Sequence, residues 1–119
     1  MEEKLIRALE ATGLPVYALE RPETIKNCIV YKYSESNDSY SDDKADIEKY
    51  TIYINLYCES GLNKYKKLIK ESMKSEGFGL EYIAPAHKSK ELATIQQAFT
   101  FIYVQKKYLK RGKNLWLIE

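Results

Sequence analysis

The chain has 119 residues, of which 45% are hydrophobic, and carries a formal net charge of +2 from 19 basic and 17 acidic residues. A chain of this length forms one domain that can bury a hydrophobic core, and the balanced charge argues against nucleic-acid binding by the whole domain. No apolar run approaches the roughly 18 to 20 residues that span a membrane. The N-terminus is charged and helical, unlike a signal peptide, so we expect a soluble intracellular protein without membrane contact.

The start of the chain predicts a helix followed by a short strand. Residues 2–11 have an apolar stripe at helical spacing, and the acidic residues Glu2 and Glu3 suit the positive end of a helix dipole. Gly13 then occupies the usual position of a C-terminal cap. Pro15 favours extended backbone, so we expect a short strand at Val16 and Tyr17 and a loop at residues 21–24.

A second strand at residues 27–33 leads into an acidic segment at residues 34–46. This segment contains four Ser, four Asp, one Glu and one Lys, with almost no apolar side chains. A long polar connection is either a solvated hairpin tip or a functional loop, and both interpretations stay open. The segment lacks the glycine and the closing glutamate of an EF-hand at the required spacing, so we predict no metal site.

The third strand, residues 47–58, sorts into two rows because strand side chains alternate between faces. One row is apolar, and the other is polar but rich in aromatic surface. The apolar row is Tyr50, Ile52, Ile54, Leu56 and Cys58, and the opposite row is Thr51, Tyr53, Asn55 and Tyr57. The chain has 11 tyrosines, a residue type that suits half-wet interfaces as well as ordinary strand positions.

A second helix is predicted at residues 62–76, with Ser60 as a suitable N-cap. Apolar residues at three- and four-residue spacing give it one buried face. These residues are Leu62, Tyr65, Leu68, Ile69 and Met73, and the lysines elsewhere on the helix are Lys64, Lys66, Lys67, Lys70 and Lys74. The lysine distribution favours a solvated helix face over nucleic-acid contact. Gly77 and Gly79 flank Phe78 and end the helix.

Two further strands are expected at residues 80–84 and 95–108, separated by Pro85 and a turn at residues 86–91. The last strand is apolar on both faces, with Phe99, Phe101 and Tyr103 on one and Ala98, Ile102 and Val104 on the other. A basic tail then leads to Leu-Trp-Leu-Ile at residues 115–118. The basic residues either contact phosphates or form a soluble extension. The apolar tetrapeptide should fold back on its own domain or dock on a neighbour, because it is costly to expose to water.

These elements predict a single α+β domain at residues 1–108, with residues 109–119 as a C-terminal extension. Its element order is α-β-β-β-α-β-β. We expect a mostly antiparallel, twisted sheet of four to five strands with both helices on one face. Both faces of this sheet carry large apolar groups, so one face should meet the helices and the other another copy of the chain. The last strand is apolar on both sides, so the sequence leaves open which face meets the helices.

The sequence contains no recognisable catalytic constellation. The only histidine, His87, follows a proline in a predicted turn, and Cys28 and Cys58 lie within strands, where thiols usually act as small hydrophobes. No nucleophile has a base and an orienting partner at recognisable spacing, and no glycine-rich phosphate loop is present. We therefore predict a protein that is not an enzyme and that uses no cofactor. A pocket around His87 or Cys58 with a strongly perturbed pKa would revive the enzyme interpretation.

An ordered set of features resembles the tail-completion, or tail-terminator, proteins of long-tailed bacteriophages. The set begins with the first helix running into Gly-Leu-Pro-Val-Tyr at residues 13–17, and covers about residues 1–108. It continues with the strand at 28–33 ending in Tyr-x-Tyr, the Asp-rich loop, the aromatic strand at 51–57, the helix closing at Gly77 and Phe78, and the final strand with Phe99 and Phe101.

The resemblance implies a non-enzymatic assembly protein that caps the tail tube and joins the tail to the head connector. Its expected partners are copies of itself in a ring, typically of six, the tail tube protein and the head connector or stopper protein. DNA would only pass through the ring. The protein would act in the host cytoplasm and then remain in the virion at the head–tail junction. The alternative is another small tail or connector component, or a protein-binding module of bacterial or prophage origin.

Two groups of residues are candidates for these contacts. The predicted protein interface consists of Tyr53, Tyr57, Phe101, Tyr103 and Trp116. The predicted loop toward the tube, the connector or the lumen contains Asp38, Tyr40, Asp42, Asp43 and Lys44. An acidic lumen would repel DNA phosphates and limit sticking during passage.

Overall fold

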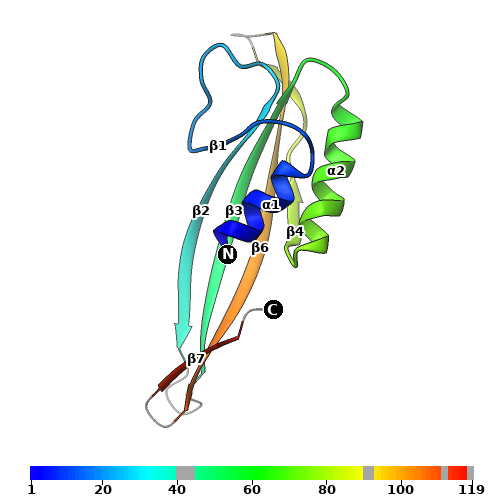
Figure 1. The fold of residues 1–119 in the computed structure, drawn as a ribbon. Helices are drawn as coiled ribbons and strands as arrows, with labels where there is room; N and C mark the ends of the chain where they lie inside the picture. The colour runs from blue at the N-terminus through cyan, green and yellow to red at the C-terminus, as the bar shows by residue number, and fades with distance from the viewer. Residues whose placement is uncertain (40–44, 90–92, 111–112, 118–119) are drawn as a thin grey trace.

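The computed structural model describes the backbone of residues 1–39, 45–89, 93–110 and 113–117, and the side chains of residues 1–36, 47–89 and 93–105. These residues form one domain of two helices and seven strands (Figure 1). The helices are α1 (Glu2–Glu10) and α2 (Leu62–Ser75). The strands are β1 (Val16–Ala18), β2 (Cys28–Ser39), β3 (Ala45–Cys58), β4 (Gly79–Ile83), β5 (His87–Ser89), β6 (Thr94–Lys110) and β7 (Lys113–Leu117).

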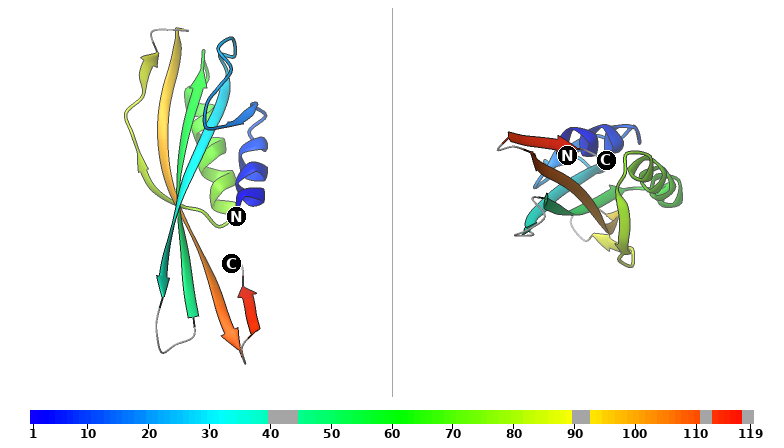
Figure 2. Two further views of the ribbon diagram at one scale, coloured as in Figure 1. Left: turned by 90° about the vertical axis from the view of Figure 1, so that its left-hand side faces the viewer. Right: turned by 90° about the horizontal axis from the view of Figure 1, so that it is seen from below.

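All seven strands belong to one twisted sheet. Its main order is β1-β2-β3-β6-β4, and both β5 and β7 pair with β6. The β1–β2 pair is parallel and the other pairs are antiparallel. Both helices lie on the same face of the sheet, which Figure 2 shows from the side and from below. The predicted α+β class, the predominantly antiparallel sheet and the two helices on one face are thus confirmed.

The apolar row of β3 faces the helices and forms the centre of the core. Ile52 pairs with Phe101 on β6, and Ile54 pairs with Phe99, so the two strands present one continuous apolar surface. The helices contribute fully buried side chains, namely Leu5 and Leu9 from α1 and Ile69 and Met73 from α2. Each fully buried side chain of this size contributes roughly 1.5 to 3 kcal/mol. The apolar rows of β3 and β6 and the apolar stripes of the two helices therefore pack together as the core.

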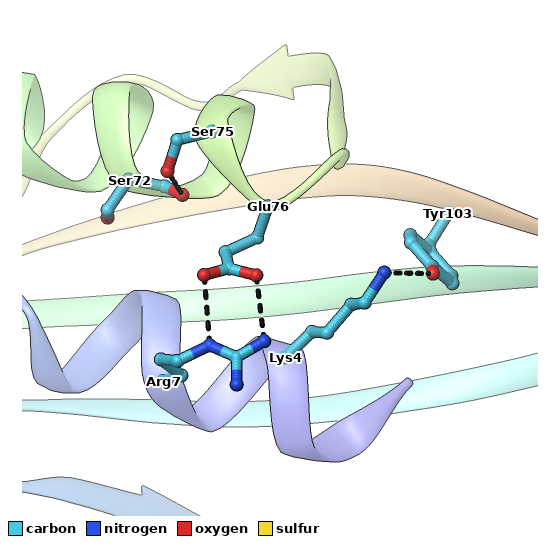
Figure 3. Close-up of polar contacts among 6 residues, drawn as sticks. All are labelled: Lys4, Arg7, Ser72, Ser75, Glu76 and Tyr103. Carbon is cyan, nitrogen blue, oxygen red and sulfur yellow. Dashed lines mark hydrogen bonds and ion pairs between the residues drawn. The ribbon is translucent and has the colours of Figure 1, made fainter. Parts of the chain in front are cut away.

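The two helices are tied together by polar groups at their ends (Figure 3). The Arg7 guanidinium donates to both carboxylate oxygens of Glu76, each at 3.0 Å. This hydrogen-bonded pair raises the pKa of Arg7 and lowers the pKa of Glu76. Lys4 donates from Nζ to the hydroxyl of Tyr103 at 3.2 Å, which links α1 to β6. These contacts fix α1 across the sheet beside α2.

The end of α2 is stabilised by a glycine in left-handed backbone conformation. Gly77 has φ +94°, and its N–H donates to the carbonyl of Lys74. The N–H of Phe78 donates to the carbonyl of Met73, which completes a Schellman motif. Phe78 and Met73 are both buried in the core, so the cap also directs the chain back to the sheet as β4. The predicted role of the glycines is confirmed for Gly77.

Several predicted boundaries are wrong. Strand β2 continues to Ser39 and β3 begins at Ala45, so part of the predicted loop at residues 34–46 is a paired hairpin stem. These strands continue beyond their apolar residues because β2 and β3 pair with each other through their backbones. The predicted turn at 86–91 contains β5, and β6 extends beyond both predicted ends. Ser60 does not cap α2, because the N-cap position is Gly61.

The sheet extends well beyond the helices. The described chain measures 56 × 23 × 22 Å along its principal axes. Figure 1 shows β2, β3 and β6 continuing away from the two helices as a narrow arm, with β7 folded back against β6 at its end. Backbone pairing of Trp116 with Lys107 places the predicted apolar tail against its own domain. The domain therefore has a helix-covered half and an arm in which the sheet stands alone.

Candidate functional site

One face of the sheet carries no helix. We call it the open face. Its side chains point away from the helices and include Lys32, Lys49, Thr51, Tyr53, Tyr57, Tyr82, Thr100, Ile102 and Val104. Strand alternation produces it, since each of these residues is one position away from a residue on the helix-covered face. Tyr82 is 58% exposed, and Tyr53 and Val104 are each 39% exposed. Large aromatic and apolar side chains therefore meet water on a broad, regular surface.

The centre of the open face is a row of cross-strand neighbours. Lys32 pairs with Tyr53, Tyr53 pairs with Thr100, and Thr100 pairs with Tyr82 on the edge strand. The Lys32 ammonium lies 5.8 Å from the centroid of the Tyr53 ring. A tyrosine in this setting offers apolar area and a hydroxyl to a partner while losing little side-chain entropy.

A shallow polar pocket of about 540 Å³ lies at the end of the open face that is away from the arm. Arg21, from the loop after β1, covers the ring of Tyr57 with its guanidinium carbon 4.0 Å from the ring centroid. One terminal guanidinium nitrogen of Arg21 is buried and has no hydrogen-bond partner among the described residues. Asn55 and Gln96, which are hydrogen-bonded at 3.3 Å, form part of the lining. The pocket thus presents amide groups and charges of both signs, including Arg21 and Glu20, at the edge of an aromatic surface.

The structure separates the five residues of the predicted protein interface. Tyr53 and Tyr57 share one side of the sheet, as their strand row predicts, and the structure shows that this side faces away from the helices. Phe101 and Tyr103 lie on the opposite side, each 1% exposed, and belong to the core beneath the helices. They are therefore not available to a partner of the folded subunit. Trp116 belongs to β7 through its backbone, and its side chain lies outside the described part of the structure.

The predicted loop is described only in part. The backbone of Asp38 pairs with Ile47 in the β2–β3 hairpin, so this position is in the stem. Tyr40, Asp42, Asp43 and Lys44 lie outside the described residues. The prediction that they reach the tube, the connector or the lumen stays a prediction.

The two thiols lie on opposite faces of the sheet and do not form a pair. Cys28 is opposite Tyr57, one residue out of register with Cys58. Both are free and buried, and burial raises the pKa of each thiol. A raised pKa disfavours the thiolate, which is the nucleophilic form.

His87 is exposed on β5. Within the described ranges, no three His, Cys, Asp or Glu side chains come together in a way that could hold a metal ion.

Sequence reasoning missed two parts of this surface. Tyr82 received no role, because a β-bulge between Leu80 and Tyr82 decides which of these residues faces outward. Arg21 was missed because it comes from a loop, where no periodicity places a side chain. Only the folded structure shows that this loop brings Arg21 over Tyr57 on the tyrosine-rich strand β3.

Comparisons with known proteins identify no relative. The sequence matches no protein-family model and no curated protein. Among the described residues, none of the helices is long and apolar enough to cross a membrane.

Proposed function

We propose that the protein is a non-enzymatic phage assembly protein that caps the tail tube and joins the tail to the head connector, acting as a ring of copies. The observation that carries this proposal is the open face. It is a sheet surface with exposed tyrosines and apolar groups, and it lies on the side opposite the helices that complete the core.

The composition of the open face supports a protein partner. Interfaces are enriched in tyrosine, and Tyr53 and Tyr82 lie in one cross-strand row of this face with Thr100 between them. Contact with another protein would remove this aromatic surface from water. The long arm adds reach, since it carries sheet surface beyond the compact half of the domain. The resemblance to tail-terminator proteins supplies the particular function, with tail tube and head connector as partners and DNA only in transit.

Electron microscopy of particles made without the protein tests the proposal. In a phage or prophage that encodes the chain, deletion of its gene should leave headless tails, often of irregular length, beside filled heads. Normal, complete virions from the deletion would overturn the assembly function.

A matched pair of variants then tests the open face itself. Tyr53 and Tyr33 are both 39% exposed, but they lie on opposite sides of the sheet. Because interface tyrosines are common hot spots, Tyr53→Ala should weaken binding to tail ends by roughly tenfold or more, whereas Tyr33→Ala should have little effect. Equal behaviour of the two variants would contradict a role for the open face.

The alternative function is that of another small tail or connector component, or a protein-binding module. An open tyrosine-rich face suits such a module equally well. Ring formation and binding to the tube end distinguish the two, because only a tail terminator requires both.

A further inference from the structure

The polar pocket at the end of the open face is lined by segments that are far apart in the chain. Asn55 and Tyr57, from the outward row of β3, meet residues of the loop after β1 and of β5 around it. Figure 1 shows the loop after β1 at the end of the sheet opposite to the arm. The pocket therefore adjoins the aromatic open face but has a polar lining of its own.

Arg21 places an uncompensated positive charge in this pocket. Its guanidinium carbon lies 4.0 Å from the centroid of the Tyr57 ring, and this cation–π contact holds the cation against β3. In the part of the chain that the structure describes, the guanidinium makes no hydrogen bond or ion pair, and one of its nitrogens is buried. A buried charged donor without a partner is unfavourable. Because Arg21 as a whole is only half-buried, a ligand in the pocket can reach the guanidinium and supply the missing acceptor.

The backbone just before Arg21 is held in a strained turn. Leu19 has φ +72°, and the N–H of Glu20 donates to the carbonyl of Ala18 at 2.8 Å, so these residues form a γ-turn with positive φ. Such backbone persists only where the surrounding structure imposes it, and here the N–H of Leu19 is anchored to the carbonyl of Tyr31 at 2.8 Å. The turn leaves the Leu19 side chain 76% exposed beside the pocket. The strained turn thus places an apolar side chain and a cation at one recess.

The other polar groups of the lining are mainly donors. The Gln96 amide donates to Oδ1 of Asn55 at 3.3 Å, and the NH2 group of Asn55 has no hydrogen-bond partner among the described residues. Lys88, on β5, adds a second positive charge. Glu20 also lines the pocket, but it is exposed and forms no ion pair with Arg21 in the described chain. The lining therefore suits an acceptor with a single negative charge better than a phosphate dianion, which Glu20 would repel more strongly.

We propose that this pocket binds a carboxylate group of a protein partner. The planar guanidinium of Arg21 matches the two oxygens of a carboxylate, and its contact with Tyr57 positions it before the ligand arrives. The NH2 group of Asn55 supplies a further donor, and Leu19 offers apolar contact to the residue that carries the carboxylate. Small-molecule sites enclose most of their ligand, whereas this pocket is shallow and continues into the tyrosine row, so a protein that covers the open face would also cover it.

The carboxylate comes either from a chain end or from an Asp or Glu side chain, and both sources have the same chemistry. The inference concerns the pocket alone and does not depend on tail assembly.

NMR titration of the intact chain with short acetylated peptides tests the proposal. Gly-Gly-Leu with a free C-terminal carboxylate represents a chain end, and Gly-Glu-Leu as a C-terminal amide represents a side chain. The control peptide is Gly-Gln-Leu amide, which has no carboxylate. At least one carboxylate peptide should bind with a Kd of about 1 mM, shift the Asn55 side-chain amide signals, and bind about tenfold more tightly than the control. The tighter of the two carboxylate peptides identifies the source.

Variants then test the role of Arg21. Arg21→Gln should weaken binding of the carboxylate peptides by about tenfold, and Arg21→Lys should recover only part of the loss, because lysine keeps the charge but not the planar fork. Lys49→Gln is the matched control. Lys49 is exposed on the open face but does not line the pocket, so the loss of its charge should leave binding unchanged. Thermal unfolding by circular dichroism shows whether each variant folds, and the comparison of peptides on the unaltered chain needs no variant.

Four outcomes would overturn the proposal. The first is no binding of either carboxylate peptide at about 10 mM. The second is equal affinity for peptides with and without a carboxylate. The third is full affinity in a folded Arg21→Gln variant. The fourth is a single-stranded DNA oligonucleotide that binds more tightly than either peptide and loses affinity in Arg21→Gln, which would assign the pocket to phosphate. None of these decides the proposed function, which depends separately on the phenotype of the deletion.

Discussion

Replacing Phe101 with alanine tests which face of the sheet is the core. Phe101 is 1% exposed, pairs across the sheet with Ile52 and Leu80, and stacks with Phe99 at a centroid distance of 6.3 Å. Truncation removes the ring from these contacts and leaves a cavity, because neighbouring side chains relax only in part. We expect Phe101→Ala to lower the free energy of unfolding by roughly 3 to 5 kcal/mol. This is a large fraction of the roughly 5 to 15 kcal/mol of a typical domain.

The adjacent residue gives a matched control on the opposite face. Ile102 follows Phe101 on β6 but points to the open face and is only half-buried. Ile102→Ala should therefore cost about 1 kcal/mol, since it removes a smaller area from a surface that can adjust. Urea unfolding of both variants measures the difference. The assignment of the core would be refuted by equal costs, or by a cost for Phe101→Ala below about 2 kcal/mol.

Three further changes probe other parts of the fold. Gly77→Ala should cost about 1 to 2 kcal/mol in urea unfolding, because an alanine is strained at φ +94°. Burial and a 2.6 Å hydrogen bond to Glu2 raise the pKa of Tyr31 from 10.0 to about 12. The Tyr31 contribution to the free energy of unfolding should thus be complete below about pH 10 and disappear toward pH 12. In the Glu2→Gln variant this hydrogen bond to a carboxylate is lost, so tyrosinate absorbance should show Tyr31 titrating at lower pH than in the unaltered chain. Cys58 is fully buried with a raised pKa, so a thiol reagent should modify it slowly in the native protein and quickly in denaturant; rapid native modification would contradict its burial.

Local patterns in the chain determined most of the secondary structure. The alternation of residues 47–58 and the stripe of α2 identified the central strand, the second helix and their apolar faces, because strand and helix geometry force these periods on side chains that share one core. Gly77 was recognisable as a helix end, since a left-handed residue at that position is usually glycine.

Long-range pairing decided what local patterns could not. Residues 34–39 are polar and predicted as a loop, yet they form strand because they pair with β3 along their whole length. The predicted interface divided between two faces because β6 is apolar on both sides, and its row containing Phe101 could be assigned only when Ile52 paired with it. Side-chain period alone does not say which face the helices cover.

The sequence by itself therefore determined the two helices, the central parts of the main strands, the apolar row of β3, and where basic and acidic residues concentrate along the chain. Only the tertiary structure decided which face of the sheet stays open and that Arg21 lies over Tyr57. The reason is physical. Periodicity is set by the local backbone, whereas faces, edges and grooves are set by contacts between segments far apart in the chain.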